Sequence, residues 1–524
     1  MRSSNKQQFL FGKIKEVPFY FHWISEFFHK SNIKESNKLS DQTCDDLDFE
    51  ELFMFLDRTN SSVGQQYFYY QLRTISKDAT IKSEDEVIID EIANNLNFRK
   101  TVEDKLRSLN STEAYYISKL FQEKSFEVPR WYKLLPILTL MTLFSLIGLL
   151  IFPDLIYIIP FLLIANMWIH YRNKNNLDYY ISALPELVKL YKVSHFFTKK
   201  YPNYFAKQDI SKSLHEIKKM KKHFYLFQME NRLQGDVTTI LWGLLELFKI
   251  SLLLEPILFR KLITKLNTNK LDIKNLHSFI GKLDMLYSVS SLRSGLNTYS
   301  KPDFHNQEFN LIAKGIYHPL IPDCIKNDIN TSGKSVLLTG SNMSGKTTFI
   351  RTIGINLITA LNLNTCFADS IQLPFMNLLS AIRISDDLMN DKSYYFEEVA
   401  TIKNIIENSY NESYSLILLD EIFKGTNTVE RISAGKAVLS YLSKKNNLIF
   451  VSTHDIELAD LLKNEFNLFH FNESIENDKV SFDYKLKQGK VKTRNAINIL
   501  KLSDYPDEII KDAFSTVKSM ESKF

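Results

Sequence analysis

Hydrophobic and polar positions divide this chain into a helical N-terminal part and a C-terminal part that contains strands. Between residues 40 and 310, apolar residues recur at helical spacing over most of the sequence, which predicts helices. Beyond residue 311, three short apolar runs predict buried strands, namely Ser335–Thr339, Ser415–Leu419 and Leu448–Thr453. Helical segments separate these runs. The predicted fold class is therefore mixed, with a mainly α-helical core followed by an α/β domain.

One stretch lacks the polar stripe of a soluble helix. Leu134–Tyr171 contains Asp154 as its one formally charged side chain. Its first half, Leu134–Phe152, is close to the roughly 20 residues that a helix needs to cross a bilayer. Pro153–Asp154 predicts a turn, and Leu155–Tyr171 supplies a second apolar span. We expect a transmembrane helical hairpin, and a hairpin buried in a large core is the alternative.

Basic residues lie at both ends of this hairpin, with Arg130 and Lys133 before it and Arg172 after it. The positive-inside rule then places both ends in the cytoplasm. We expect the chain to lie in the inner (cytoplasmic) membrane, with its other domains in the cytoplasm. A third apolar stretch, Val237–Phe259, contains several charged side chains, among them Lys249. Because charges are costly in lipid, it is predicted to be a buried core helix.

Candidate chemistry begins at Gly340–Thr347, whose sequence GSNMSGKT fits the phosphate-binding pattern G-x-x-x-x-G-K-[ST]. A predicted strand precedes it and a predicted helix follows it, so a glycine-rich turn that contains a lysine by chance is the weaker alternative. Lys346 is expected to reach the β and γ phosphates of a nucleoside triphosphate, and Thr347 to bind Mg²⁺. The predicted nucleotide-binding residues are Gly340, Ser341, Asn342, Met343, Ser344, Gly345, Lys346, Thr347 and Thr348.

The partners of phosphoryl chemistry follow in the expected order. Asp420 and Glu421 come directly after the apolar run at 415–419, and His454 follows the run at 448–453. Asp420 is expected to hold Mg²⁺ together with Thr347, while Glu421 polarises the attacking water. His454 at a neighbouring strand end can sense the γ-phosphate. The sequence therefore predicts hydrolysis of a nucleoside triphosphate with Mg²⁺.

Further motifs surround these residues. Ser393–Val399 (SYYFEEV) lies between the P-loop and the acidic pair, and Gly425–Thr428 (GTNT) follows that pair. In these motifs the chain resembles the MutS family of DNA mismatch-repair ATPases, from Tyr317–Leu320 to Ala513. The resemblance implies ATP as the nucleotide, and a homodimer in which Ser393 caps the γ-phosphate held by the partner subunit. With Ser393, which the resemblance supplies, the expected catalytic residues are Ser393, Glu421 and His454.

The same resemblance implies a domain organisation for the rest of the chain. Leu47–Ile75 is similar to the start of the helical core in MutS-like proteins, and Tyr484–Leu486 and Pro506–Ser519 are similar to the dimerising tail. The expected domains are an N-terminal lead (1–39), a first core part (40–130), the hairpin (131–172), a second core and lever part (173–310) and the ATPase domain with C-terminal dimerising helices (311–524). No aromatic residue near Cys324 matches the family's adenine-stacking position, so base stacking is assigned to Tyr317 or to another residue.

Charge and cysteine content change this picture little. The net charge of +5 neither requires nor excludes nucleic acid, and the three cysteines lack metal-binding spacing. The basic run Lys212–His223 fits a solvated helix face, a surface for anionic lipid or a contact for DNA phosphate. The pattern leaves all three open.

Direct reading of mismatches is not expected from this sequence. Mismatch readers of the family carry a Phe-x-Glu wedge in an N-terminal domain for which this chain has little room. Phe121–Glu123 and Phe471–Glu473 match the tripeptide, as chance predicts for a chain with 38 Phe. We expect a membrane-anchored, MutS-like ATPase that binds DNA, mismatched or branched, as a homodimer. The alternative is an ATP-driven membrane scaffold or switch with a protein partner and no mismatch recognition.

Overall fold

The computed structural model describes residues 11–524 apart from several internal gaps and the last three residues. The gaps are 35–36, 76–77, 124–129, 175–177, 206–209, 221–242, 244–246, 306–308, 342, 384–393, 410–413, 477–478 and 492–504, and the end is 522–524. A helical N-terminal region precedes a mixed α/β region, which confirms the predicted order. The chain forms two compact units, here called the helical unit (1–32, 57–70 and 83–294) and the α/β unit (33–56, 71–82 and 295–524).

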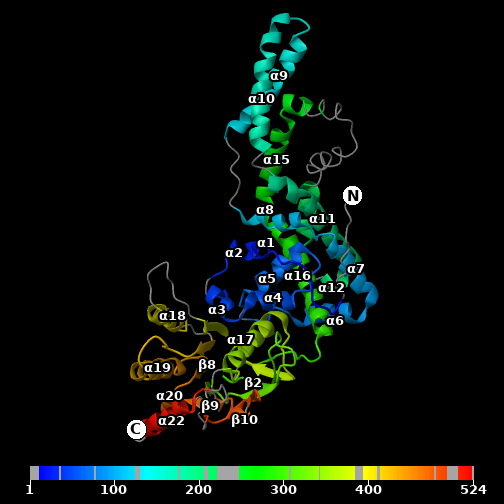
Figure 1. Cartoon of the computed structure of the whole chain (residues 1–524). Coiled ribbons are helices and arrows are strands. Elements are labelled where there is room, and N and C mark those ends of the chain that lie inside the picture. Colours follow the sequence, from blue (N-terminus) through cyan, green and yellow to red (C-terminus); the bar gives the residue numbers. More distant parts are fainter. Residues whose placement is uncertain are drawn as a thin grey trace. The chain divides into compact units, whose positions relative to one another are not determined.

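The helical unit is built around the long helix α16 (Lys270–Gly295), which is buried over most of its length. Its other elements are α1 (Phe21–Ile24), α2 (Glu26–His29), α5 (Ser62–Leu72), α6 (Ser83–Asn94), α7 (Leu96–Arg107), η2 (Thr112–Ile117), α8 (Lys119–Gln122), η3 (Arg130–Leu134), α9 (Leu135–Gly148), η4 (Pro153–Tyr157), α10 (Ile159–Lys174), α11 (Asp178–Lys200), α12 (Pro202–Phe205) and α15 (Leu254–Thr268) (Figure 1).

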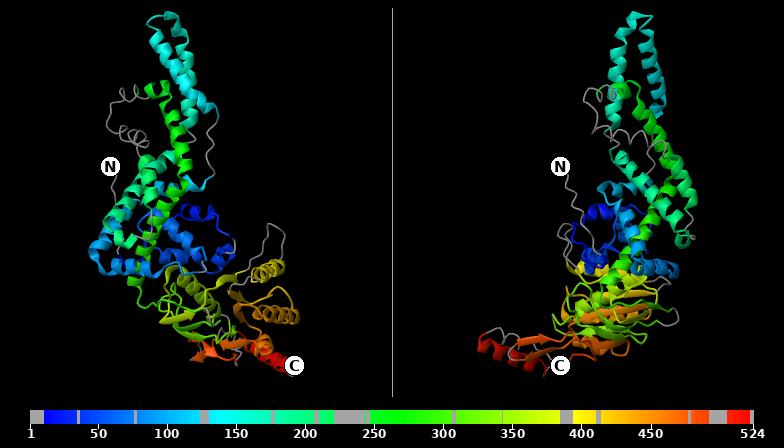
Figure 2. Two further views of the ribbon diagram at one scale, coloured as in Figure 1. Left: turned by 180° about the vertical axis from the view of Figure 1, so that it is seen from behind. Right: turned by 90° about the vertical axis from the view of Figure 1, so that its right-hand side faces the viewer.

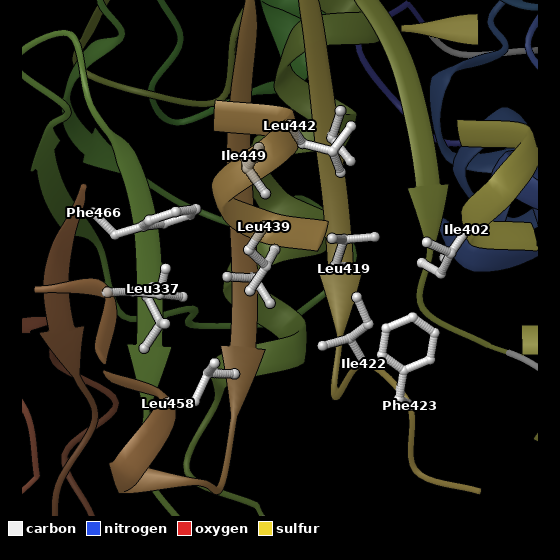
Figure 3. Close-up of a cluster of buried hydrophobic side chains, with 14 of the residues drawn as sticks. Leu337, Ile402, Leu419, Ile422, Phe423, Leu439, Leu442, Ile449, Leu458 and Phe466 are labelled. Atoms are coloured by element: carbon white, nitrogen blue, oxygen red, sulfur yellow. The ribbon is translucent and has the colours of Figure 1, made fainter. Parts of the chain in front are cut away.

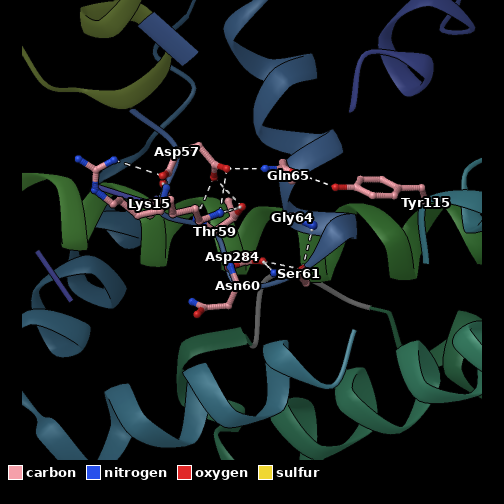
Figure 4. Close-up of polar contacts among 11 residues, drawn as sticks. Lys15, Asp57, Thr59, Asn60, Ser61, Gly64, Gln65, Tyr115 and Asp284 are labelled. Carbon is pink, nitrogen blue, oxygen red and sulfur yellow. Dashed lines mark hydrogen bonds and ion pairs between the residues drawn. The ribbon is translucent and has the colours of Figure 1, made fainter. Parts of the chain in front are cut away.

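A buried polar network joins the start of α5 to α16 (Figure 4). Asp284 accepts hydrogen bonds from the backbone N–H groups of Asn60 and Ser61, both at 2.8 Å, and from the Ser61 hydroxyl at 2.5 Å. Asp57, in the same turn, pairs with Lys15 at 2.8 Å. Because the first N–H groups of a helix lack intrahelical partners, this carboxylate satisfies donors that burial would otherwise leave unpaired.

The predicted hairpin is a pair of helices, α9 and α10, joined through η4, and they lie side by side in all views (Figures 1 and 2). Two 18-residue windows, Trp131–Gly148 and Pro153–His170, are long and apolar enough to cross a bilayer, and only 17% and 22% of them are buried. A hairpin buried in a core is therefore not what the structure has. Membrane insertion of these helices stays a prediction.

The prediction of a buried core helix at 237–259 is wrong for the part that the structure describes. Leu253 has a φ of +46° and separates a helical segment at 247–251 from α15. Leu247 and Phe248 are 59% and 57% exposed. The charged residues of this stretch argued against a membrane span and therefore for a core helix. The described segment packs against the hairpin.

The basic run begins in an amphipathic helix at 211–220. Leu214, Ile217 and Met220 are buried, whereas Lys218 and Lys219 face solvent. Exposed lysines fit each of the three alternatives that the sequence leaves open, a solvated face, anionic lipid and DNA phosphate. Residues 221–223 of the run lie outside the described residues, and contact with lipid or DNA stays a prediction.

The α/β unit contains a six-stranded sheet in the order β12-β9-β4-β8-β7-β6, in which β12 alone is antiparallel to its neighbour. Its strands are β4 (Ser335–Thr339), β6 (Asn377–Ala381), β7 (Ser415–Asp420), β8 (Asn447–Thr453), β9 (Phe466–His470) and β12 (Lys487–Gln488). A second sheet has the order β1-β5-β2-β3, with β1 (Asp303–Phe304), β2 (Ile312–Ile316), β3 (Asn327–Asn330) and β5 (Ser370–Leu373). β10 (Glu473–Glu476) pairs with β11 (Lys479–Phe482).

Helices cover both faces of the larger sheet. Side chains of α18 (Tyr394–Asn408), α19 (Thr428–Ser443) and α20 (Ile456–Leu462) pack on one face in a fully apolar cluster (Figure 3). Ile417 and Leu419 of β7 point into this cluster, whereas Leu418 between them contacts α17 (Lys346–Leu363) at Gly354. Side chains alternate along a strand, so α17 lies on the opposite face. The C-terminal helix α22 spans Asp507–Glu521.

Two segments from the N-terminal half belong to the α/β unit, which differs from the linear domains expected from sequence. One carries α3 (Asp41–Asp46) and α4 (Phe49–Leu56). Asp46 accepts hydrogen bonds from the Ser380 hydroxyl at 2.6 Å and from the Arg383 backbone N–H at 2.7 Å. Asp48 pairs with both Arg351 at 2.8 Å and Arg383 at 2.6 Å. These contacts join residues more than 300 positions apart, which local sequence patterns do not predict.

Candidate nucleotide site

The P-loop connects the buried strand β4 to the start of α17, as predicted. Gly340 and Gly345 have φ values of +148° and +107°. A Cβ atom at Gly340 would lie 2.8 Å from the carbonyl oxygen of Phe471, so the loop requires glycine there. Met343 at the tip is 82% exposed, and Ser344 is buried beneath it. Asn342 lies outside the described residues.

Lys346 begins α17 and points back into the loop. Its Nζ donates hydrogen bonds to the carbonyl oxygens of Gly340 at 2.8 Å and Ser341 at 2.7 Å. Burial lowers the pKa of the Lys346 ammonium to about 8. A buried cation at the N-terminus of a helix is suited to polyanionic phosphate groups, because the backbone N–H groups add to its charge. The neighbouring Thr348 lies in the first turn of the same helix.

Thr347 and Asp420 meet at the carboxyl edge of the sheet. The Thr347 hydroxyl donates to Asp420 Oδ2 at 2.7 Å, and the Ser452 hydroxyl donates to the other carboxylate oxygen. They meet because β4, β8 and β7 are adjacent parallel strands that end together. A hydroxyl and a carboxylate oxygen fit the hard ligand set of Mg²⁺, which in nucleotide sites also uses phosphate oxygens and water. Within the described part of the chain, no three His, Cys, Asp or Glu side chains form a metal cage.

Glu421 and His454 form the second pair that the sequence predicted. His454 Nε2 lies 2.6 Å from Glu421 Oε1, and Lys424 Nζ lies 3.0 Å from the other oxygen. The hydrogen bond from His454 lowers the pKa of Glu421 to about 2. Glu421 has a φ of +52°, which turns its side chain from the strand end towards the cavity that it lines. The carboxylate is thus ionised over the whole physiological range.

A cavity of about 870 Å³ opens beside the P-loop. Its walls come from the P-loop, the β2–β3 loop around Cys324, Phe471 and the segment Phe482–Tyr484. Such a volume holds a molecule of nucleotide size. Tyr317, one predicted stacking candidate, lies in this wall with its hydroxyl bonded to the Thr298 carbonyl at 2.5 Å.

Tyr484 is a site residue whose role the sequence did not indicate. The resemblance assigns it to a dimerising tail, and the structure places it in the cavity wall, where its ring would lie 3.3 Å from a Cβ atom at Gly345. Phe482 stacks on it at 5.8 Å between ring centroids. Asn327 holds the turn, since its side chain donates to the Tyr484 carbonyl at 3.0 Å and accepts from the Leu486 N–H at 2.8 Å.

Glu473 is a second residue of the site that sequence reasoning missed. The Ser341 hydroxyl donates to its carboxylate, and this side chain is almost fully buried. The Phe471–Glu473 tripeptide therefore belongs to the P-loop surroundings. The other Phe-x-Glu match lies in and after α8 of the helical unit, where Phe121 packs on Phe27 and His277.

Ser393 lies outside the described residues, so its predicted role stays a prediction. The helix that follows it, α18, is anchored to the turn after Glu421. Glu398 accepts hydrogen bonds from the Lys424 N–H at 3.1 Å and the Gly425 N–H at 3.5 Å. A Cβ atom at Gly425 would lie 2.7 Å from Tyr395 Cβ, so this contact also requires glycine. The start of α18 is thereby coupled to the acidic end of β7.

Comparison with known proteins agrees with this geometry. Residues 336–521 match the family described as MutS domain V. The C-terminal part of this chain is a MutS-type ATPase domain. The chain is 28% identical over 282 residues to the DNA mismatch repair protein MutS of Aquifex pyrophilus, which covers 52% of this chain and 32% of that protein. It is 29% identical over 314 residues to the DNA mismatch repair protein MSH3 of Saccharomyces cerevisiae, covering 56% and 30%.

The chain spans about a third of the length of these curated relatives. The MutS-type domain thus accounts for the P-loop, the acidic pair and the helices α17 to α22. The hairpin at 131–172 lies outside this domain.

Proposed function

We propose that this chain is a membrane-anchored MutS-type ATPase that works as a homodimer on DNA. The observation that carries the proposal is the assembled site, in which Thr347 meets Asp420 at 2.7 Å and Glu421 meets His454 at 2.6 Å. Thr347 and Asp420 would hold Mg²⁺, which neutralises phosphate charge when bound. Glu421 is placed to orient and deprotonate the attacking water, and His454 fixes the direction of its carboxylate.

The exposed apolar side chains of the α/β unit support the homodimer. Met343 at the P-loop tip is 82% exposed, Phe396 in α18 is 57% exposed, and Val429 in α19 is 77% exposed. Met343 lies in the nucleotide-binding loop, Phe396 lies in the segment after Ser393, and Val429 follows the turn after Glu421. A partner subunit docked there would bury apolar surface and bring its own Ser393 towards the γ-phosphate, as the resemblance implies. ATP would then join the subunits, and hydrolysis would release them.

The polarity of the hairpin supports the membrane anchor. Large apolar side chains point outwards, among them Phe144 (66% exposed), Leu150 (88%) and Phe161 (77%). The polar Thr142 and Asn166 are fully buried, and the Asn166 amide donates to the Thr142 hydroxyl at 3.1 Å. A soluble helix pair has the opposite arrangement, so this surface fits lipid better than water. Both ends of the hairpin would face the cytoplasm, with the ATPase and core domains on that side.

DNA is proposed as the partner because the relatives are DNA mismatch repair proteins. The hairpin favours a second candidate, an ATP-driven membrane scaffold or switch that acts on a protein partner. The two differ in one measurable property. A DNA-binding protein loses affinity steeply with salt, because each phosphate contact releases a counterion.

The test is DNA binding by the purified, detergent-solubilised chain with and without ATP across a salt series. Homoduplex, mismatched and branched DNA are compared at each salt concentration. ATP-dependent binding with a steep salt slope supports the DNA role, and a preference among substrates identifies the structure bound. Absence of binding at low salt, in protein that still hydrolyses ATP, overturns the DNA role and leaves the scaffold. Deleting residues 134–171 should release the chain from membranes if the hairpin is its anchor.

A further inference from the structure

Hairpin side chains hold the segment 247–253 at a helix end. Leu253 has a left-handed backbone with φ of +46°, which interrupts the helix before α15. The Thr139 hydroxyl donates to the Leu252 carbonyl at 2.9 Å, and the Asn166 amide donates to the Ser251 carbonyl at 2.9 Å. The last carbonyls of a helix lack intrahelical partners. One side chain from α9 and one from α10 therefore satisfy carbonyls at this end.

Apolar contacts hold the same segment against the base of the hairpin. Leu253 is fully buried in a cluster with Tyr132, Leu135 and Ile169. Ile250 is also buried, at 6% exposure. The segment is thus packed against both hairpin helices, and α15 contacts α9 and α10 directly after it (Figure 1).

The position of these contacts along the hairpin sets the depth of the segment. Asn166 donates hydrogen bonds both to Ser251 and to Thr142. Thr142 lies midway in sequence between Trp131, at the start of the first apolar window, and the Pro153 turn. The segment 247–253, drawn in green just before α15, lies beside the hairpin helices and below their tip in all views (Figures 1 and 2). A bilayer that covers the hairpin would also cover residues 247–253.

The outward side chains of the segment are apolar. Leu247 and Phe248 are 59% and 57% exposed. Lys249 is half-buried, and its flexible stem allows the ammonium to reach polar groups or an interface. In hydrocarbon, a helix break is tolerated only where neighbouring groups satisfy the freed carbonyls. The Thr139 and Asn166 hydrogen bonds meet this requirement, which would matter little at a site open to water.

We propose that residues 247–253 form a third bilayer-embedded element, docked on the hairpin by Asn166 and Thr139, with Leu247 and Phe248 against lipid acyl chains. This inference rests on the proposed membrane anchor. It makes the membrane part of the chain a three-part structure, in which the helix break is capped across helices. It also explains why polar side chains are buried at Thr142 and Asn166, because Asn166 of α10 hydrogen-bonds both to α9 and to the segment.

Spin-label accessibility tests the proposal in the full chain reconstituted in phosphatidylcholine vesicles. Nitroxides are attached at F248C, at F144C in the hairpin and at L96C, which is 51% exposed on α7 outside the hairpin. Cys324 is replaced by Ser, and the buried Cys44 and Cys366 are kept. Collision rates with oxygen, which is enriched in lipid, and with a water-soluble nickel chelate are compared. The expected result is that positions 248 and 144 favour oxygen, while position 96 favours nickel.

The outcomes separate this inference from the proposed function. Nickel accessibility at position 248 with lipid-like behaviour at 144 would overturn the third element and leave the anchor in place. Nickel accessibility at both positions would reject the anchor itself. The double variant N166L/T139V, which removes both capping groups, should raise nickel collisions at position 248 several-fold and leave position 144 unchanged. S145A, elsewhere in α9, serves as the control for a polar-to-apolar change in this helix. An unchanged position 248 in the double variant would refute the docking role.

Discussion

His454 Nε2 lies 2.6 Å from Glu421 Oε1, so the histidine at the end of β8 holds the carboxylate at the end of β7. The two strands are parallel neighbours, and their register pairs Asp420 with Ser452. The positive φ of Glu421 directs its side chain towards the cavity, where Lys424 binds the second oxygen at 3.0 Å. The site therefore presents an ionised, oriented carboxylate next to the P-loop.

Replacement of Glu421 by Gln should strongly slow turnover and keep nucleotide bound. The amide has nearly the same shape but cannot accept a proton from water, and loss of a general base costs about 10²–10⁴-fold in rate. We expect ATP hydrolysis to fall by that factor and the ATP-bound dimer to accumulate, as measured by phosphate release and light scattering. E457Q, on the exposed start of α20, serves as the control. Unimpaired hydrolysis in E421Q would remove Glu421 from the catalytic set.

Removal of His454 should change the acid stability of the protein. The pKa of Glu421 is lowered to about 2 from 4.5, chiefly by the His454 hydrogen bond. A lowered pKa stabilises the fold above pH about 4.5, and this stabilisation is lost as pH falls towards 2. Because Glu421 is only partly buried and water screens the ion pair, the contribution is on the order of 1 kcal/mol. H454A raises the folded pKa, so between pH 5 and 3 the variant should lose less stability than the native chain in calorimetric unfolding. Parallel losses in both proteins would show that the hydrogen bond does not set this pKa.

Lys346 should take up a proton when nucleotide binds. Burial lowers its pKa to about 8, so roughly half of the free chains carry a neutral Lys346 at pH 8. A triphosphate stabilises the ammonium and raises the pKa again. We expect uptake of about half a proton at pH 8 and almost none at pH 6, measured by titration calorimetry in buffers of different ionisation enthalpy. K346R remains charged at both pH values, so its uptake should be close to zero. Equal uptake by the two proteins would assign the proton to another group.

Gly64 should not tolerate a side chain. A Cβ atom at this position would lie 2.1 Å from Asp284 Oδ2, in the network that caps α5. We expect G64A to destabilise the helical unit by about 1–3 kcal/mol and to increase hydrogen exchange in α5 and α16. The control is G435A in α19, where the nearest atom would lie at an ordinary 3.4 Å from Ile422. Because alanine favours helix over glycine by up to ~1 kcal/mol, exchange in α19 should stay the same or decrease.

Local chemistry made much of the nucleotide site predictable from sequence. The P-loop glycines, Lys346, Thr347 and Asp420 follow from a motif whose spacing is dictated by phosphate and metal geometry. Glu421 and His454 follow from the rule that adjacent parallel strands end together. Each of these inferences needs only a strand and the residues that directly follow it. The helix pair at 135–174 was likewise visible as an apolar run without a polar stripe.

Residues that act through distant contacts were not predictable in this way. Asp48 reaches Arg351 and Arg383 from the N-terminal half of the chain, and Glu473 reaches Ser341 from a separate hairpin. Tyr484 carries no local signal of a nucleotide site, because its position depends on Asn327 holding the turn. For the segment at 247–253, nearby charged residues argued against a membrane span and so predicted a core helix. Its actual position depends on hydrogen bonds from hairpin side chains, which are distant in sequence.

The ring of Tyr484 lies beside the P-loop at Gly345 and stacks on Phe482, which leaves it placed to stack on a nucleotide base. Stacking of a base on an aromatic side chain contributes about 1–3 kcal/mol. Y484A should therefore weaken ATP binding about 5- to 150-fold, whereas Y484F should bind as the native chain does. Inorganic tripolyphosphate has the phosphates but no base, so its affinity should be the same in all three proteins. Y441A, on the outer part of α19, controls for loss of an exposed tyrosine. An equal loss of affinity for ATP and tripolyphosphate in Y484A would mean that Tyr484 supports the P-loop at Gly345 and does not stack on the base.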